Sequence, residues 1–386
     1  MANISFVREK SIPQLPPPIS ESNTIGWVRK NLFSNEVDFK KFWKKFEEKK
    51  KLPQELVEIT DKFIASKSFP FISSWWRYCN IKDIKKLCQL GIENYGEIFF
   101  HYYTWHDWSE EEIKDTFEIL DTELINEKIN IFKLHNGLTR NESFKSNMLM
   151  LLLYKILKQT DEYNFLAKME DTSFCSNGHP FIDIDDMKIS HDKVNSLLQF
   201  SEINRSKILK ENSHILEIGA GSGRMADTIL SINNKNKYVI CDVPIAIYIS
   251  YYRLKKRFKE KKIELAIDID NQNDLEDCIK KNDLVFIFPH QLKFIKNKIF
   301  DLTIAISCLH EMEKETLKFM MSNINNISHN FYFSIWKNTD LPFSLRGTNL
   351  KASNLEEDYF ISSKWTQKLK KKSYFPSNII QFLYSI

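Results

Sequence analysis

One stretch, Ser213 to Leu230, constrains the fold of this chain more than any other. Its first part is a short apolar segment, and three glycines then follow at alternate positions, Gly219, Gly221 and Gly223, before a helical pattern begins. Glycine accepts a positive φ and has no Cβ, so such a turn lets the backbone approach a ligand, while the helix start offers unpaired N–H groups. The stretch therefore predicts a strand, a ligand-binding turn and a helix in succession.

Apolar segments alternate with helical ones from this stretch to the end of the chain. We expect strands at residues 214–218, 238–241, 284–288, 302–307 and 330–335, with 263–267 as a further candidate and 379–386 as an edge strand. The basic segment 364–372 is expected to be a solvated helix. Strands and helices that alternate at this spacing predict an α/β fold, a Rossmann-like doubly wound sheet. Ligands of such sheets bind beyond the carboxyl ends of the strands, where the glycine turn is expected to lie.

The first half of the chain has a different pattern. Aromatic residues recur at the spacing of one buried helix face, as in Phe39, Phe42, Trp43 and Phe46. A length of 386 residues favours two domains. We expect an extended proline-rich arm at 1–24, an all-helical N-terminal domain at 25–170, a connecting loop at 171–192 and the sheet domain at 193–386.

Composition excludes several classes of protein. The formal net charge of +4 is too small to indicate a nucleic-acid partner, and six scattered cysteines suggest neither a disulfide framework nor a zinc knuckle. The apolar run 148–154 is far shorter than the roughly 20 residues that span a bilayer, and no secretion signal is recognisable, so we expect a cytoplasmic protein. Asp183, Asp185 and Asp186 lack an EF-hand spacing, so no metal site is predicted there.

Two residues beside the glycines distinguish between cofactors. Dinucleotide-binding turns place a small residue at the sixth position of GxGxxG, but here that position is Arg224. Glu217, two residues before the first glycine, would repel a pyrophosphate and attract the ammonium group of S-adenosylmethionine. Asp242 ends the second strand, where a carboxylate can accept hydrogen bonds from ribose hydroxyls in either cofactor class. The pattern therefore favours S-adenosylmethionine.

Four stretches then resemble a known family: 216–224 (LEIGAGSGR), 239–252 (VICDVPIAIYISYY), 287–292 (IFPHQL) and 300–312 (FDLTIAISCLHEM). The first resembles the class I S-adenosylmethionine-dependent methyltransferases. The others, together with the helical first half, resemble the bacterial family of sugar O-methyltransferases. The resemblance implies a seven-stranded methyltransferase sheet and an enzyme that methylates a hydroxyl of a sugar, either a nucleotide-activated sugar or a precursor of a surface polysaccharide.

The resemblance also assigns residues to the cofactor. It implies that the three glycines line the methionine end, that Asp242 holds the ribose and that Ser307 lies beneath the reacting centre. Gln291 is expected to contact the adenine if 284–288 is the third strand. The predicted cofactor-binding residues are thus Glu217, Gly219, Ala220, Gly221, Gly223, Arg224, Asp242, Val243, Gln291 and Ser307.

The acceptor hydroxyl needs a base to remove its proton. His310 and Glu311 follow the strand end where donor and acceptor should meet, and the sequence leaves open which of them is the base. His179, with Asn177, lies in the connection between the two halves and is predicted to contact the acceptor. Methylation of a non-sugar molecule, a non-catalytic S-adenosylmethionine-binding module, a dehydrogenase and a homodimer all remain open.

Overall fold

The N-terminal part of the described chain is helical. The structure is a computed structural model that describes residues 39–68, 71–96, 130–135, 138–169, 179–336, 359–374 and 379–386. Its first elements are α3 (Phe39–Lys45), the 3₁₀ helix η1 (Glu47–Lys51), α4 (Gln54–Ala65), α5 (Ser74–Leu90), η3 (Ile92–Asn94), α9 (Arg140–Thr160) and α10 (Phe165–Lys168). The predicted aromatic face is present in α3, where Phe39 and Trp43 are buried.

The predicted connecting loop contains a small hairpin instead of a plain loop. Strands β1 (Ile182–Ile184) and β2 (Met187–Ile189) pair antiparallel. The two residues between them, Asp185 and Asp186, have φ angles of 49° and 59°. Such left-handed conformations are those of a two-residue hairpin turn, and short polar side chains tolerate them. Helix α11 (His191–Arg205) follows directly, with Ser190 as its N-cap.

The second half forms an eight-stranded sheet in the order β5-β6-β4-β3-β7-β8-β10-β9. The strands are β3 (His214–Ile218), β4 (Lys237–Cys241), β5 (Ile263–Leu265), β6 (Leu284–Ile287), β7 (Leu302–Ile306), β8 (Asn330–Trp336), β9 (Thr366–Lys372) and β10 (Ile379–Ser385). All neighbouring pairs from β5 to β8 are parallel. The doubly wound α/β prediction is confirmed, but the sheet has eight strands instead of seven, because β9 joins it beside β10.

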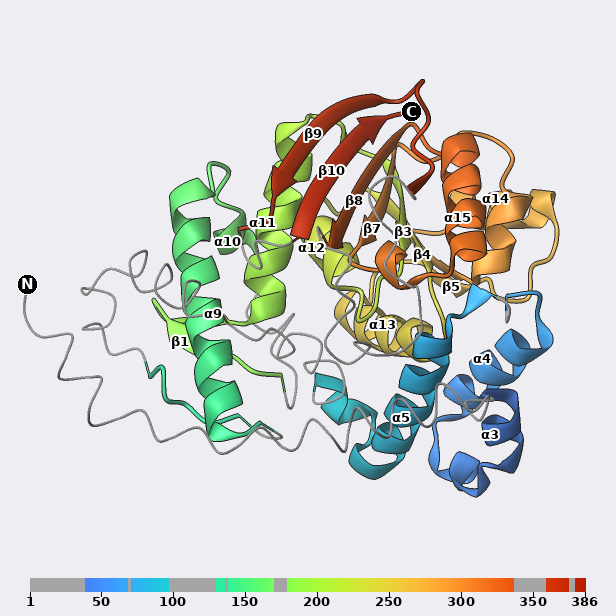
Figure 1. Ribbon diagram of the computed structural model, residues 1–386, viewed down its shortest axis with the longest axis horizontal. Coiled ribbons are helices and arrows are strands. Elements are labelled where there is room, and N and C mark those ends of the chain that lie inside the picture. The colour runs from blue at the N-terminus through green and yellow to red at the C-terminus, as the bar shows by residue number, and fades with distance from the viewer. Residues whose placement is uncertain are drawn as a thin grey trace, which may run out of the picture.

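Helices cover both faces of this sheet (Figure 1). One face packs against α11, α12 (Arg224–Ile232) and α13 (Pro244–Arg257), and the other against α14 (Gln272–Lys281) and α15 (Lys314–Ile327). The hydrophobic cluster on the α12 face continues into the N-terminal helices, because it includes Phe63 and Leu151. The helical part and the sheet therefore share one continuous core.

The C-terminal hairpin differs from the prediction. Strand β10 was expected at the edge, but it pairs antiparallel with β8 on one side and β9 on the other. The edge is β9, a lysine-rich segment for which the sequence favoured a solvated helix. Lys368, Lys370 and Lys372 are exposed and Leu369 is partly buried, so the segment has the alternation of a strand that contributes little to the core.

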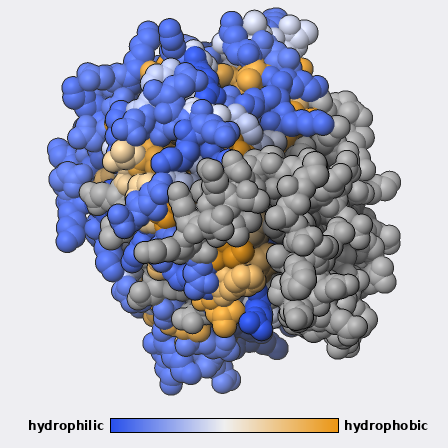
Figure 2. Space-filling model, turned by 90° about the vertical axis from the view of Figure 1, so that its left-hand side faces the viewer, coloured by the Kyte–Doolittle hydropathy of each residue, from blue (hydrophilic) through white to orange (hydrophobic). Residues whose placement is uncertain are grey.

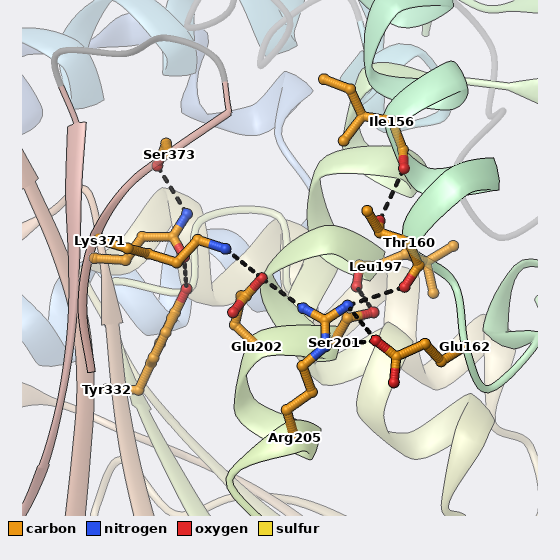
Figure 3. A network of polar contacts seen from close by, with 11 residues as sticks. Ile156, Thr160, Glu162, Leu197, Ser201, Glu202, Arg205, Tyr332, Lys371 and Ser373 are labelled. Atoms are coloured by element: carbon orange, nitrogen blue, oxygen red, sulfur yellow. Dashed lines mark hydrogen bonds and ion pairs between the residues drawn. The ribbon is translucent and has the colours of Figure 1, made fainter. Parts of the chain in front are cut away.

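A polar network joins this hairpin to the helices (Figure 3). Lys371 on β9 donates to Glu202 on α11 at 2.6 Å, and Arg205 donates to the same carboxylate at 2.8 Å. Arg205 also reaches Glu162 and the carbonyl of Thr160 at the end of α9. The network connects three elements that are distant in sequence.

On the side of α9, the described residues visible in Figure 2 are mainly hydrophilic, with hydrophobic patches between them. Phe132 and Leu134, which precede α9, are among the exposed large apolar side chains. Within the described residues, no helix is both long enough and apolar enough to cross a membrane.

Candidate functional site

The glycine turn lies at the carboxyl end of β3. The amide of Gly219 donates to the carbonyl of Cys241 at 3.0 Å, and that of Gly223 to Ala220 at 2.9 Å. Gly219, Gly221 and Gly223 have φ angles of 71°, 58° and 76°. These backbone conformations favour glycine, which explains the spacing in the sequence.

The three glycines differ in their surroundings. A Cβ on Gly219 would lie 2.6 Å from Cβ of Cys308, and one on Gly223 would lie 2.9 Å from Cδ1 of Leu254. A Cβ on Gly221 would have no neighbour within 4 Å. Gly219 and Gly223 therefore permit close packing, whereas Gly221 faces open space that a ligand can occupy.

Asp242 follows β4, the neighbour of β3, and faces the same turn. Its Oδ2 accepts a hydrogen bond from the amide of Gly221 at 2.9 Å, and its Oδ1 accepts one from Val243 at 2.7 Å. Burial raises the pKa of Asp242 to about 6, against the opposing effect of these two N–H groups. Each oxygen keeps a lone pair, so the carboxylate can accept two further hydrogen bonds, as a ribose diol would supply.

A buried ion pair stabilises the glycine turn. Arg253 on α13 donates to the carbonyl of Ser222 at 2.9 Å and pairs with Asp227 on α12. The side chains of Arg253 and Asp227 have exposed fractions of 6% and 0%. The sequence does not reveal this pair, because no local pattern links two residues on successive helices.

Glu217 and Arg224 both have hydrogen-bond partners within the protein. Glu217 is buried on the sheet face that packs against α12 and α13, where the hydroxyl of Tyr238 donates to it at 2.8 Å. Burial raises the pKa of Glu217 to about 7, against the opposing effects of Tyr238 and Arg224. Arg224 donates to Ser196 and Gln199 on α11, both at 2.8 Å. Their predicted contacts with the cofactor are not visible in this geometry and stay predictions.

The segment after β7 forms the side of the candidate site that lies across from Asp242. The chain runs outward from β3 through β4 and then returns to β7 on the other side of β3, so the strand order reverses between β3 and β7. Ser307 has a φ of 53° and its amide donates to the carbonyl of Ser334 on β8 at 3.1 Å. Cys308 donates to the carbonyl of Ile218 at 3.1 Å. The glycine turn and the segment after β7 therefore meet at the switch point, where doubly wound sheets bind ligands.

Three carboxyl groups lie near enough to Cys308 to affect its pKa. Burial raises the pKa of the Cys308 thiol well above its usual value, and the nearby charges of Asp242, Glu311 and Glu217 add to this effect. These residues come from the ends of β4, β7 and β3. The structure thus brings together the predicted ribose-binding residue and one of the two predicted bases.

His310 and Glu311 have different electrostatic properties. Both belong to the 3₁₀ helix η7 (Leu309–Glu311), with His310 Nε2 4.0 Å from Glu311 Oε1. Burial lowers the pKa of His310 to about 3, which makes its imidazole a weak base. Burial raises the pKa of Glu311 to about 8, against the effect of the Trp76 indole, whose Nε1 donates to Oε2 at 2.8 Å. Glu311 therefore has the better basicity for proton transfer near neutral pH.

Gln291 uses its side chain for hydrogen bonds within the protein, and its predicted contact with the adenine stays a prediction. Strand β6 does neighbour β4, as the preferred alignment required. However, both N–H groups of Gln291 donate to backbone carbonyls, of Ala266 and Ile269, each at 2.7 Å, and Oε1 accepts from the amide of Phe288 at 2.6 Å. A buried amide satisfies its donors, so Gln291 fixes the loop after β5.

In the connection between the halves, His179 is buried. Nε2 of His179 lies 3.6 Å from Oδ2 of Asp192 at the start of α11, and burial lowers the pKa of His179. Asn177 lies outside the described residues. Asp183 and Asp185 pair with Lys133 and Lys158 at 3.0 and 2.9 Å. No cluster of metal-ligating side chains occurs in the part of the chain that the structure describes.

A hollow of about 500 Å³ lies elsewhere, at the amino ends of the strands. Residues 231–236 line it, between the end of α12 and the start of β4, together with Phe200, Asn204, Leu209 and Glu211. We favour the carboxyl edge as the functional site, because the glycine turn, Asp242 and Glu311 converge there and parallel sheets bind ligands at that edge.

Comparisons with known proteins do not identify a family for this chain. No family model matches the chain, and no curated protein does. Solved structures that resemble it include a SAM-dependent methyltransferase from Aquifex aeolicus, with 14% identity, a TM-score of 0.33 and coverage of 48% of this chain and 88% of that one. An S-adenosylmethionine-dependent methyltransferase from Clostridium acetobutylicum ATCC 824 has 10% identity and a TM-score of 0.35, over 60% of this chain and 98% of that one. The mitomycin 7-O-methyltransferase has 9% identity and a TM-score of 0.33, over 50% and 56%. Likeness at this level establishes no activity for this chain.

Proposed function

We propose that the protein is an S-adenosylmethionine-dependent O-methyltransferase that methylates a hydroxyl of a sugar, as a nucleotide-activated sugar or a surface-polysaccharide precursor. The observation that carries this proposal is the position of Asp242. Its carboxylate is held by the amide of Gly221, beside the open space over that glycine, and Glu311 lies across the switch point from it. A carboxylate able to accept hydrogen bonds from ribose hydroxyls, a turn that a ligand can approach and a candidate base thus support the proposal from one edge of the sheet.

The residues present fit such a cofactor. Asp242 offers two oxygens to the ribose hydroxyls, and the missing side chain of Gly221 leaves room for the methionine end. S-adenosylmethionine, when bound, supplies a methyl group that is already activated as a sulfonium. The protein then has to align the acceptor and exclude water.

The structure favours Glu311 over His310 as the proton acceptor. An acceptor hydroxyl loses its proton as the new bond forms, and a base with a pKa near the working pH serves best. The pKa of Glu311 is raised to about 8, whereas that of His310 is lowered to about 3. Glu311 would therefore take the proton, while His310 would contribute to the wall of the site.

The sugar as acceptor rests on the family resemblance of residues 239–252, 287–292 and 300–312. A screen of nucleotide sugars, free sugars and other small hydroxyl compounds, read by mass spectrometry as a gain of one methyl group, tests it. Methylation restricted to non-sugar compounds would contradict the proposed acceptor class. Cofactor binding without turnover on any compound would favour a non-catalytic binding module.

The cofactor site has a sharper test. Changing Asp242→Ala removes both ribose contacts and should weaken S-adenosylhomocysteine binding at least about 100-fold, since hydrogen bonds to a charged group contribute about 1.5–3 kcal/mol each. Asp301→Ala is the matched control, because Asp301 accepts from the amide of His214 at 2.8 Å at the opposite end of the strands. Isothermal titration calorimetry measures both. Equal affinity of Asp242→Ala and the wild type would remove the assignment.

A further inference from the structure

The N-terminal helices contact the carboxyl edge of the sheet directly. Ser68, just after α4, lies with its Oγ 2.6 Å from Nδ1 of His290, and the backbone amide of His290 donates to the same oxygen at 2.9 Å. His290 belongs to η6 (Pro289–Phe294), which follows β6. Ser68 and His290 are both buried. These contacts fix the end of α4 against the sheet.

A second set of contacts fixes α5 beside it. Asn80 in α5 accepts a hydrogen bond from the amide of Ile245, at the start of α13, at 3.4 Å. The rings of Phe71, just before α5, and Phe319 on α15 stack with centroids 4.3 Å apart. The beginning of α5, from its first turn to Asn80, is thus held between helices from both faces of the sheet.

Trp76 lies in that first turn. The N-cap Ser73 accepts a hydrogen bond from the backbone amide of Trp76 at 3.3 Å, which orders the turn. The indole Nε1 reaches Oε2 of Glu311 at 2.8 Å, across 235 positions of sequence. Glu311 is nearly buried, with a side-chain exposed fraction of 10%. A hydrogen bond to a carboxylate in such surroundings is strong and directional.

We propose that Trp76 is a positioning residue for Glu311: its indole N–H holds Oε2 of the carboxylate and leaves Oε1 directed to the acceptor hydroxyl. This inference rests on the proposed function, since it takes Glu311 as the base. It also gives the helical part a role at the reacting centre. Without α5, the carboxylate would be free to rotate.

The hydrogen bond also affects when Glu311 is charged. The indole N–H stabilises the carboxylate and so lowers the pKa of Glu311 relative to burial alone. Among the described residues, the other titratable groups recorded near Glu311 are His310 on the same 3₁₀ helix and the Cys308 thiol before it. The imidazole of His310 is neutral above a pH of about 3, so its charge does not change in the working range.

Nuclear magnetic resonance tests whether the Trp76 indole responds to the ionisation of Glu311, and it needs no methyl acceptor. The chain has eight tryptophans, so ¹⁵N-tryptophan labelling gives few indole signals, and Trp76→Phe assigns the one of interest. That signal should shift with pH around a midpoint of about 8, as Glu311 ionises. In Glu311→Gln the shift should disappear. A signal of Trp76 that is flat from pH 6 to 10, or that titrates equally in Glu311→Gln, would overturn the proposal.

Kinetics then test the role of the coupling. Trp76→Phe keeps an aromatic ring but loses the donor, so its pH–rate profile should move to higher pH, and kcat at neutral pH should fall about tenfold. The affinity for S-adenosylhomocysteine should stay unchanged, which also shows that the variant is folded. An unshifted pH–rate profile would refute the positioning role. The nuclear magnetic resonance result needs no methyl transfer, so it distinguishes a failed coupling from a failed assignment of function.

Discussion

At the scale of single residues, Gly219 and Gly221 allow a matched pair of alanine substitutions. Both have a positive φ, so alanine at either position costs about 1–2 kcal/mol of backbone strain. Only at Gly219 does the new Cβ also meet the side chain of Cys308. Gly219→Ala should therefore lower the free energy of unfolding by about 2 kcal/mol or more, through strain and overpacking together.

Gly221→Ala should instead weaken ligand binding more than it lowers stability. Its Cβ would enter the open space assigned to the cofactor, so binding of S-adenosylhomocysteine should weaken at least tenfold while the loss of stability stays near the strain alone. Thermal unfolding and calorimetry measure the two quantities. If Gly221→Ala bound as tightly as the wild type, the ligand would have to lie on another side of the turn.

The sequence predicted the backbone of this site better than its side chains. The glycine spacing located the turn, and Asp242 followed from its position at a strand end. The direction of Glu217 could have been found from strand alternation, because it shares a face with Ile215, on the α12 side. The contact of Trp76 with Glu311 could not, since nothing local relates residues 235 positions apart.

At the scale of elements, the C-terminal hairpin shows the limit of sequence patterns. Strands β3, β4, β6, β7 and β8 are apolar runs that a buried parallel sheet requires, and the sequence located each of them within two residues. Strand β9 has few apolar residues, so its lysines suggested a solvated helix. Its pairing depends on β10, a tertiary contact that overrides local preference.

The lysines of β9 suit its edge position. An unpaired strand edge invites pairing with another chain, and exposed lysines oppose it. Replacing Lys368, Lys370 and Lys372 together by threonine should keep the fold and cofactor affinity but increase aggregation on concentration, measured by light scattering. The matched control replaces the same three residues by arginine, which keeps the charge. Equal aggregation of the two triple variants would show that charge is not the protecting feature.

At the scale of the whole molecule, buried titratable groups set how stability depends on pH. Burial lowers the pKa of His179, His191, His290 and His310, so these side chains bind protons more readily in the unfolded state. Stability is therefore lost as the pH falls below about 6.5, the ordinary pKa of histidine. Burial acts oppositely on Glu217 and Glu311, whose pKa values are raised to about 7 and about 8.

The folded state thus binds more protons at these two carboxyl groups than the unfolded state, and stability falls as the pH rises through 8. We expect the melting temperature to be highest near pH 6.5–7 and to decrease on both sides. Glu311→Gln replaces a buried charge by a neutral amide of similar shape. It should therefore raise the melting temperature at pH 8.5 by several degrees and make the melting temperature depend less on pH above pH 7. The same substitution should abolish turnover. Calorimetric scans from pH 5 to 9 measure this. Because a buried carboxyl group destabilises the fold when it ionises, an unchanged dependence of the melting temperature on pH above pH 7 in Glu311→Gln would show that this group is not ionising within the folded protein.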